Sequence, residues 1–311
     1  MNEKILQNSI EQAQKIISQS KDWQQTYEEQ SKTLIDNKPL LDQFHKQIKS
    51  YEAIQFYLVK VNPTQDNIFT IQARYQGQPI ATIEITKDDT TITTKEYDES
   101  NKKTYNCELK LDNMNLNTKE ANQFLTYFNK EMKPKGKIDE QAHIESMLLT
   151  EFSKTSSYDK LLTGIQPCKI NQNLFFPIPI NLNPKEDTGY INILTRTKVR
   201  KLTIIEPITE TQSLETVLAN ATSKAIFLLN LLHTNQGQEW YKIMGFHGRV
   251  TPHLTIKVCI AVPKNLATKI KEFEPYELKA ETDSIEYHYM TYDTDQIKIT
   301  SIKTTLNGEQ S

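Results

Sequence analysis

The stretch GYINILTRTKVRKLTIIEPI, residues 189–208, decides how the second half of the chain is expected to fold. Two apolar segments flank a short basic tip, and the second apolar segment ends in Glu206. The alternation of β-branched and other residues predicts two strands joined as a hairpin. Asn192 lies between Ile191 and Ile193, which indicates a first strand buried on both faces. An amide in that position needs hydrogen-bond partners.

The segments around this hairpin predict an α/β domain over residues 136–311. Helical periodicity and apolar strand patterns alternate along it. The expected elements are a helix at about 138–155, strands at 173–180, 189–197 and 201–206, a helix at about 213–233, a strand at 254–263, and a closing hairpin of 285–293 and 297–306. The order of helix, three strands, helix and strand is typical of one central mixed sheet flanked by helices.

Residues 51–135 have a different pattern, which predicts an antiparallel β-meander followed by a helix. The five expected strands are IQFYLVKV, NIFTIQARY, PIATIEIT, TTITTKEY and TYNCELKL. Thr118 is the expected N-cap of the helix at 118–132, with Glu120 in its first turn. MKPKGK, residues 132–137, combines Pro, Gly and charge without periodicity and is expected to be a linker.

Residues 1–50 predict a helical arm. Isoleucines recur at roughly helical spacing in its first part, and Pro39 separates this part from a second short helix, LLDQFHKQI. The pair could form a helical hairpin that binds a protein partner. It could equally be a solvated arm that packs loosely on the rest of the chain.

Composition limits the classes of function. The 37 Lys and Arg residues nearly balance the 39 Asp and Glu residues, so the net charge of −2 gives no global attraction to nucleic acid. Any contact with DNA needs a local basic patch, and the hairpin tip is the candidate: Arg196, Lys198, Arg200 and Lys201. Three scattered cysteines predict free thiols in a reducing, cytoplasmic compartment. No apolar run is long enough to cross a membrane, so we expect no membrane partner.

Several segments of the second half carry a family resemblance. They are HIESMLL at 143–149, NLFFPIPINL, GYINILTR, LTIIEP and GQEWYKIMGFH. In order and spacing, residues 140–306 resemble the PD-(D/E)XK superfamily, also called restriction-endonuclease-like. Within it they look like a group of uncharacterised restriction-endonuclease-like proteins of Bacteroidetes type. The resemblance implies an αβββαβ core with a mixed sheet, and it does not extend to the first 135 residues.

The resemblance also implies site residues. In active members an Asp and a Glu on neighbouring strands hold a divalent metal, and a Lys two residues after the Glu orients the attacking water. A Glu on the first helix supports the site. The matching positions here are Glu145 for the helix acid, Asn192 for the Asp, Glu206 for the strand Glu and Ile208 for the Lys. A strand repeats its side-chain direction every two residues, so the Glu-x-Lys pattern normally places acid and ammonium on one face.

Two of these positions depart from the motif. Asn192 keeps an amide oxygen but lacks the negative charge that magnesium prefers, and Ile208 can neither orient nor deprotonate water. Loss of a positioned acid or base costs ~10²–10⁴ in rate. We therefore expect a catalytically degenerate nuclease-like protein that binds nucleic acid or protein, with weak Mg²⁺ binding at most through Glu206, Glu145 and Asn192.

Two alternatives remain open. The chain could be an active Mg²⁺-dependent DNA endonuclease with a displaced lysine, and Lys224 is the candidate because it lies beside the apolar stripe of the helix at 213–233. It could also be a structural or interaction protein unrelated to nucleases, binding its partner through the helical arm. The endonuclease would use Glu145, Glu206 and Asn192 together with this lysine. If there is no site, Glu145, which shares a helix face with apolar residues, could cap a neighbouring backbone, and Glu206 would be a strand-end acid facing solvent.

Overall fold

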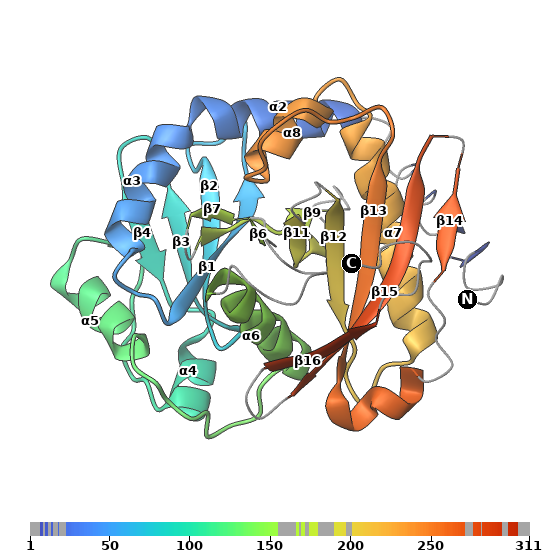
Figure 1. The fold of residues 1–311 in the computed structure, drawn as a ribbon. Helices are drawn as coiled ribbons and strands as arrows, with labels where there is room; N and C mark the ends of the chain where they lie inside the picture. The colour runs from blue at the N-terminus through green and yellow to red at the C-terminus, as the bar shows by residue number, and fades with distance from the viewer. Residues whose placement is uncertain are drawn as a thin grey trace. The chain divides into compact units, whose positions relative to one another are not determined.

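The chain has an α/β fold, as predicted, and contains two mixed sheets, one of which was expected to be an antiparallel meander (Figure 1). The computed structural model describes residues 7–8, 10–11, 14, 18, 23–154, 166–167, 169–171, 174–179, 190–196, 201–270, 276–280, 282–293 and 298–303. The chain divides into two compact units. Unit 1 comprises Met1–Thr26, Leu148–Cys168 and Ile178–Ser311, and unit 2 comprises Tyr27–Met147 and Lys169–Pro177.

Unit 2 is built on a seven-stranded sheet with the order β5-β4-β3-β2-β1-β8-β7. Its strands are β1 (Ile54–Val61), β2 (Phe69–Tyr75), β3 (Gln78–Ile85), β4 (Thr90–Thr93), β5 (Met114–Asn115), β7 (Lys169–Asn171) and β8 (Leu174–Phe175). Neighbouring strands are antiparallel, except that β8 runs parallel to β1. The first four strands match the predicted meander in place and order.

The helices around unit 2 bury apolar faces. They are α2 (Trp23–Asp36) from Tyr27 onward, α3 (Lys38–Ile48), α4 (Asp98–Tyr105), α5 (Lys119–Phe128) and the first half of α6 (Glu140–Lys154). On α3, Leu41, Phe44 and Ile48 are buried, and the Phe44 ring meets the Phe56 ring of β1 edge-on at 5.7 Å. The predicted N-cap of α5 is confirmed, because the Thr118 side chain accepts a hydrogen bond from the backbone N–H of Ala121 at 3.3 Å.

Three N-terminal predictions differ from the structure. Residues 27–50 belong to unit 2 rather than forming part of a separate arm over residues 1–50. The predicted strand TYNCELKL is wrong, because its first residues end α4, and Asn106 then adopts a left-handed φ of 58° that closes the helix. The predicted linker at 132–137 is a loop, but it lies within unit 2, where Lys135 N–H donates to the Thr104 carbonyl at 2.8 Å. The boundary between the units instead falls inside α6.

Unit 1 contains a second seven-stranded sheet, in which β14-β15-β13-β12-β11-β6 follow one another and β16 pairs with β15. Its strands are β6 (Gln166–Pro167), β11 (Leu194–Arg196), β12 (Leu202–Pro207), β13 (Thr255–Pro263), β14 (Glu277–Lys279), β15 (Ser284–Asp293) and β16 (Lys298–Lys303). The three central strands β12, β13 and β15 are parallel, and the remaining pairs are antiparallel.

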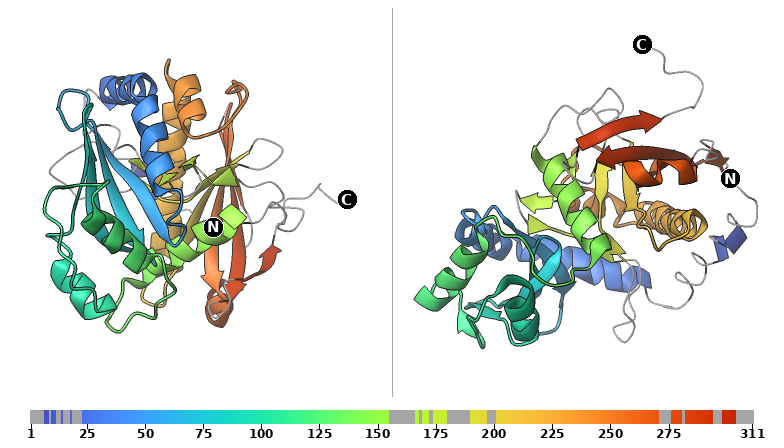
Figure 2. Two further views of the ribbon diagram at one scale, coloured as in Figure 1. Left: turned by 90° about the vertical axis from the view of Figure 1, so that its left-hand side faces the viewer. Right: turned by 90° about the horizontal axis from the view of Figure 1, so that it is seen from below.

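Helix α7 (Leu214–Leu232) runs along one face of this sheet (Figures 1 and 2). The Ser213 side chain caps its first turn by accepting from the N–H of Thr216 at 3.1 Å. The predicted apolar stripe is buried against β12 and β13, and Thr222 on α7 hydrogen-bonds the hydroxyl of Tyr287 on β15 at 2.9 Å. The short helices α8 (Gly237–Ile243) and η1 (Lys264–Ile270) also belong to this unit.

The predicted strand at 173–180 is split between the two units. Its first part, β8, joins the sheet of unit 2, and its second part, β9 (Ile178–Pro179), pairs with β10 (Tyr190–Ile191). Pro177, which lacks an N–H, lies at the break. The predicted strand at 189–197 is likewise divided into β10 and β11 by Asn192 and Ile193. No helix in the described ranges is long and apolar enough to cross a membrane.

Candidate functional site

Glu206 on β12 and Asn192, just before β11, lie on neighbouring segments of unit 1. Strands β11 and β12 are antiparallel with Leu194 opposite Ile204, and the N–H of Ile205 donates to the carbonyl of Ile193 at 3.0 Å. Asn192 belongs to neither β10 nor β11, and an extension of this register by one more residue would set it opposite Glu206. The two positions that the PD-(D/E)XK resemblance assigns to metal-binding acids are thus carried by neighbouring segments.

Lys224, on α7, places its ammonium beside the carboxylate of Glu206. Its Nζ lies 2.5 Å from Oε1 of Glu206, and the side chains of the lysine and the glutamate are only 12% and 7% exposed. Strand β12 and α7 follow each other in the chain, and α7 packs back onto the face of β12 that carries Ile204 and Glu206. Glu206 is therefore a buried, ion-paired carboxylate rather than a strand-end acid facing solvent.

Ile208, at the motif position for lysine, is fully buried. Strand β12 ends at Pro207. The backbone N–H of Ile208 still donates to the carbonyl of Ala261 on β13 at 2.9 Å. The side chain thus belongs to the apolar core, and a charged group in its place would be desolvated.

Glu145 belongs to unit 2, on the first half of α6, and it is buried with 6% of its surface exposed. Gln141 Nε2 donates to its Oε1 at 3.2 Å. Nearby, Gln55 Nε2 donates to the carbonyl of Ser146 at 2.8 Å and accepts through its Oε1 from the hydroxyl of Tyr57. Burial, the larger effect, and the charge of Glu145 both raise the pKa of Tyr57, while the charge of Arg74 lowers it. Glu145 is therefore part of a buried polar network of unit 2.

The predicted basic tip is only partly within the described residues, because Lys198 and Arg200 lie outside them. Arg196 Nη1 donates to the hydroxyl of Tyr241 at 3.2 Å and to the carbonyl of His247 at 2.6 Å. Lys201 Nζ lies 2.8 Å from Oε1 of Glu286. Both described members of the tip are thus engaged in contacts inside unit 1, where Arg196 fastens the loop after α8.

The sequence reasoning missed a cluster of charged and polar residues centred on Glu286. Lys201, Lys257 and His288 all approach its carboxylate. Burial raises the pKa of Glu286, but the hydrogen bonds of His288 and Lys201 and the charges of Lys201 and Lys257 lower it to about 2. The signal that could have revealed it is the alternation in IEYHYM, which places Glu286 and His288 on one face of a strand.

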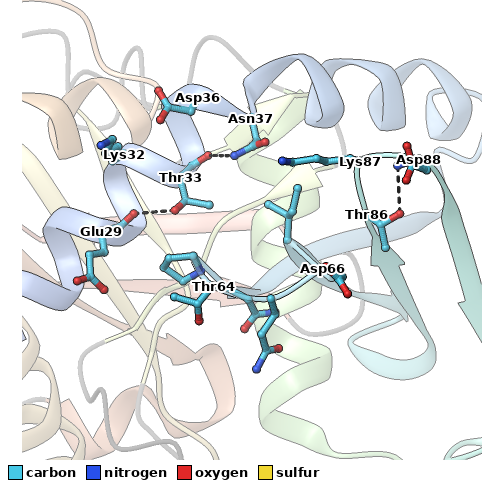
Figure 3. A pocket seen from close by; sticks show the side chains of 14 residues that line it. Glu29, Lys32, Thr33, Asp36, Asn37, Thr64, Asp66, Thr86, Lys87 and Asp88 are labelled. Carbon is cyan, nitrogen blue, oxygen red and sulfur yellow. Dashed lines mark hydrogen bonds between the residues drawn. The ribbon is translucent and has the colours of Figure 1, made fainter.

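Unit 2 contains a polar groove of about 910 Å³ between the end of α2, the loop after β1 and the β3–β4 turn (Figure 3). Two hydrogen bonds order its helical wall: Thr33 Oγ1 donates to the carbonyl of Glu29 at 2.8 Å, and Asn37 Nδ2 donates to the carbonyl of Thr33 at 2.9 Å. The Lys87 side chain extends from the turn toward Asn37. Acidic and basic side chains are mixed along the groove, so its charge selects no particular ligand.

Two of the cysteines, Cys107 and Cys259, are buried free thiols, as predicted, and Cys168 lies outside the described residues. Burial raises the pKa of Cys259 to about 12, so this thiol is not a nucleophile at neutral pH. Within the described ranges, no group of three or more His, Cys, Asp or Glu side chains is arranged to hold a metal ion. Comparisons with protein-family models, curated proteins and solved structures found no match. The PD-(D/E)XK resemblance therefore stays a prediction.

Proposed function

We propose that unit 1 carries a nuclease-like domain that does not cleave phosphodiester bonds and that acts by binding. The observation behind this proposal is that the carboxylate of Glu206 is already paired with the ammonium of Lys224 at 2.5 Å, while the position of the second motif acid holds the uncharged Asn192. Magnesium is held through carboxylate oxygens, and a single carboxylate neutralised by a lysine attracts it weakly. A site of this kind keeps the scaffold of a nuclease and loses the metal.

The burial of the pair supports a structural role. Each charge of a buried ion pair offsets part of the desolvation cost of the other, because a single unpaired charge in an apolar surrounding is strongly destabilising. With side-chain exposures of 12% for Lys224 and 7% for Glu206, the pair is enclosed by the contact between α7 and β12. Water and a phosphodiester would have to displace this contact before either group could act on them.

A second candidate function is favoured by the same contact. In an active site, the lysine has to stand within hydrogen-bonding distance of the metal-binding glutamate, and Lys224 does so from α7 instead of from position 208. Lys224 would then orient the attacking water, while Glu206 and Asn192 would hold Mg²⁺ together with water and a phosphate oxygen. This is the displaced-lysine endonuclease.

Cleavage assays separate the two functions. The full chain is incubated with supercoiled plasmid and with single-stranded DNA over a titration of Mg²⁺ and Mn²⁺, beside Glu206→Gln and Lys224→Met. The glutamine keeps the volume of Glu206, and circular dichroism checks that each variant is folded. We expect the natural chain to cut no faster than Glu206→Gln. Metal-dependent cutting that disappears in both variants would establish the displaced-lysine endonuclease and overturn the non-catalytic proposal.

The binding role is tested separately, with DNA as the first ligand. The expected contact through the basic tip is weakened by the internal partners of Arg196 and Lys201, so DNA binding depends on the remaining basic groups. Fluorescence anisotropy with duplex and single-stranded oligonucleotides at several salt concentrations gives affinity and its salt dependence. Saturable, salt-dependent binding supports a nucleic-acid role. Its absence leaves a protein partner as the ligand of a non-catalytic unit 1.

A further inference from the structure

The loop between α8 and β13, residues 244–254, carries an unbalanced positive charge (Figure 1). Residues 240–254 include Lys242 and Arg249 but contain no aspartate or glutamate. Arg196, on β11, adds a third cation because its side chain bonds to the loop. None of these three side chains forms an ion pair within the described residues, and the exposed Glu239, which precedes them on α8, pairs with none of them.

The end of α8 sets the direction in which the loop begins. The N–H of Phe246 donates to the carbonyl of Tyr241 at 3.2 Å, and the N–H of Gly245 donates to the carbonyl of Lys242 at 2.9 Å. Gly245 has a left-handed φ of 80°. These are the hydrogen bonds of a Schellman motif, and the rings of Phe246 and Tyr241, 5.4 Å apart, make the apolar contact that accompanies it.

Gln238, on α8, holds the backbone on both sides of Arg249. Its Nε2 donates to the carbonyl of Gly248 at 3.0 Å, and its Oε1 accepts from the N–H of Val250 at 3.0 Å. Lys242 follows Gln238 by four residues, so these two side chains are neighbours on one face of the helix. The ammonium of Lys242 and the guanidinium of Arg249 therefore extend from adjoining backbone segments.

Arg196 fixes the loop at a further point. Its Nη1 donates to the carbonyl of His247, two residues before Arg249, at 2.6 Å, and its guanidinium lies 5.6 Å from the centre of the Phe246 ring. The shape of the loop is thus determined by the helix end, by Gln238 and by Arg196. A binding loop that is already held in one conformation loses little conformational entropy when it binds.

The surface of the loop is polar as well as cationic. Met244 and Phe246 are buried in unit 1. The exposed members of this described segment are Gly245, His247, Gly248, Arg249, Thr251, Pro252 and His253. A stable protein interface has an apolar core, and the loop exposes no large apolar side chain that could supply one. Phosphate groups, which are bound by Lys and Arg side chains at a polar surface, fit it better.

We propose that the loop after α8 binds the phosphodiester backbone of a nucleic acid through Lys242 and Arg249. Arg196 and Gln238 are positioning residues, because they hold the segment from which Arg249 extends. This inference rests on the proposed binding role of unit 1 and names the surface that carries it. Contacts with phosphates carry no sequence information, so the binding does not depend on base sequence.

The test is fluorescence anisotropy of the full chain with a labelled duplex DNA oligonucleotide over a series of salt concentrations. Arg249→Gln and Lys242→Gln each remove one charge from an exposed side chain, and circular dichroism checks that the variants are folded. We expect each variant to lower the slope of log association constant against log salt by about 0.9. At 0.1 M salt that change corresponds to binding weakened about eightfold, equally for two unrelated sequences.

Lys264→Gln is the matched control. Lys264 is an exposed lysine of unit 1 that forms no ion pair in the described part of the chain. It follows the carboxyl end of β13, whereas the loop precedes the amino end of that strand. The nine residues of β13 span about 30 Å, so the charge of Lys264 lies far from the loop. The control should bind DNA as the natural chain does.

Binding that Arg249→Gln and Lys242→Gln leave unchanged, or that Lys264→Gln weakens equally, would overturn this inference alone. Absence of DNA binding would also overturn it, and the non-catalytic function would then require a protein partner. Vesicles of phosphatidylserine and phosphatidylcholine test the lipid alternative: if the chain binds them through Arg249 and does not bind DNA, the partner is a lipid surface. Metal-dependent cleavage would overturn the non-catalytic function and leave the loop contact in place.

Discussion

Glu206 and Lys224 are separated by 18 residues in the chain, and their charged groups meet at 2.5 Å. The contact exists because β12 ends at Pro207 and α7 returns over the face of the sheet that Glu206 shares with Ile204. An ammonium that the motif would place two residues after the glutamate is delivered here from the following helix. The same arrangement can serve as a structural ion pair or as a displaced catalytic lysine.

Removing one partner of this pair should destabilise unit 1. Lys224→Met leaves the Glu206 carboxylate buried without its cation, and breaking a buried pair in this way costs about 3–5 kcal/mol. Urea unfolding followed by tryptophan fluorescence measures the effect, because Trp23 and Trp240 both belong to unit 1 and are buried.

The double variant Glu206→Leu with Lys224→Met is the control for this prediction. Replacing both charges by apolar groups removes the desolvation cost as well as the attraction, so its free energy of unfolding should lie close to that of the natural chain. A Lys224→Met variant as stable as the natural chain would show that the pair is not enclosed in solution.

The Glu286 cluster should make the stability of unit 1 depend on acidity. In the folded state the pKa of Glu286 is about 2, below its ordinary value of 4.5. The Glu286 carboxylate therefore contributes stability above pH 4.5, and this stability is lost as the pH falls toward 2. The difference between the folded and the ordinary pKa corresponds to about 3 kcal/mol of unfolding free energy at neutral pH. In Glu286→Gln the decline between pH 4.5 and 2 should be much smaller. Urea midpoints at several pH values test this, and parallel curves for the two proteins would contradict it.

Gly77 in the β2–β3 turn of unit 2 should not tolerate a side chain. Gln76 and Gly77 have φ values of 51° and 83°, as a two-residue hairpin turn requires, and a Cβ at Gly77 would lie 2.0 Å from the backbone oxygen of Ala142 on α6. Gly77→Ala should cost more than about 2 kcal/mol, because left-handed strain adds to the clash with backbone. Thermal unfolding followed by circular dichroism measures it. Gly136→Ala, whose Cβ would meet the Thr104 side chain at 3.2 Å, should be much milder.

The fold class and most element positions could be predicted because periodicity is a local property. Apolar and polar residues alternate clearly in the meander strands, and apolar residues recur at helical spacing in α7. Thr118 is a local N-cap signal. The return of β8 to the first sheet could not be predicted, since strand pairing between Phe56 and Leu174 depends on contacts distant in sequence. The strand expected at 104–111 failed because the left-handed Asn106 ends a helix inside that segment.

The candidate site was only partly foreseeable. Glu206 and Asn192 could be named only through the resemblance of LTIIEP and GYINILTR to the PD-(D/E)XK motif, and Lys224 could be named as a candidate on the next helix. Its contact with Glu206 could not be derived, because it depends on how α7 crosses the sheet. The alternation in IEYHYM places Glu286 and His288 on one face of a strand, but the approach of Lys201 and Lys257 from segments far apart in the chain could not be derived from the sequence.

An acid at position 192 tests whether the proposed nuclease-like site can hold a metal. Asn192→Asp adds a second carboxylate on the segment next to Glu206, and hard divalent cations prefer a pair of carboxylates. Isothermal titration with Mn²⁺ should show binding at least about tenfold tighter than in the natural chain. Ile208→Lys, the other motif substitution, should instead destabilise the fold, because position 208 is fully buried. Asn192→Asp combined with Glu206→Gln is the matched control and should lose the gain. If Asn192→Asp binds Mn²⁺ no better than the natural chain does, the two positions do not form a metal site, and the resemblance to PD-(D/E)XK nucleases loses its functional meaning.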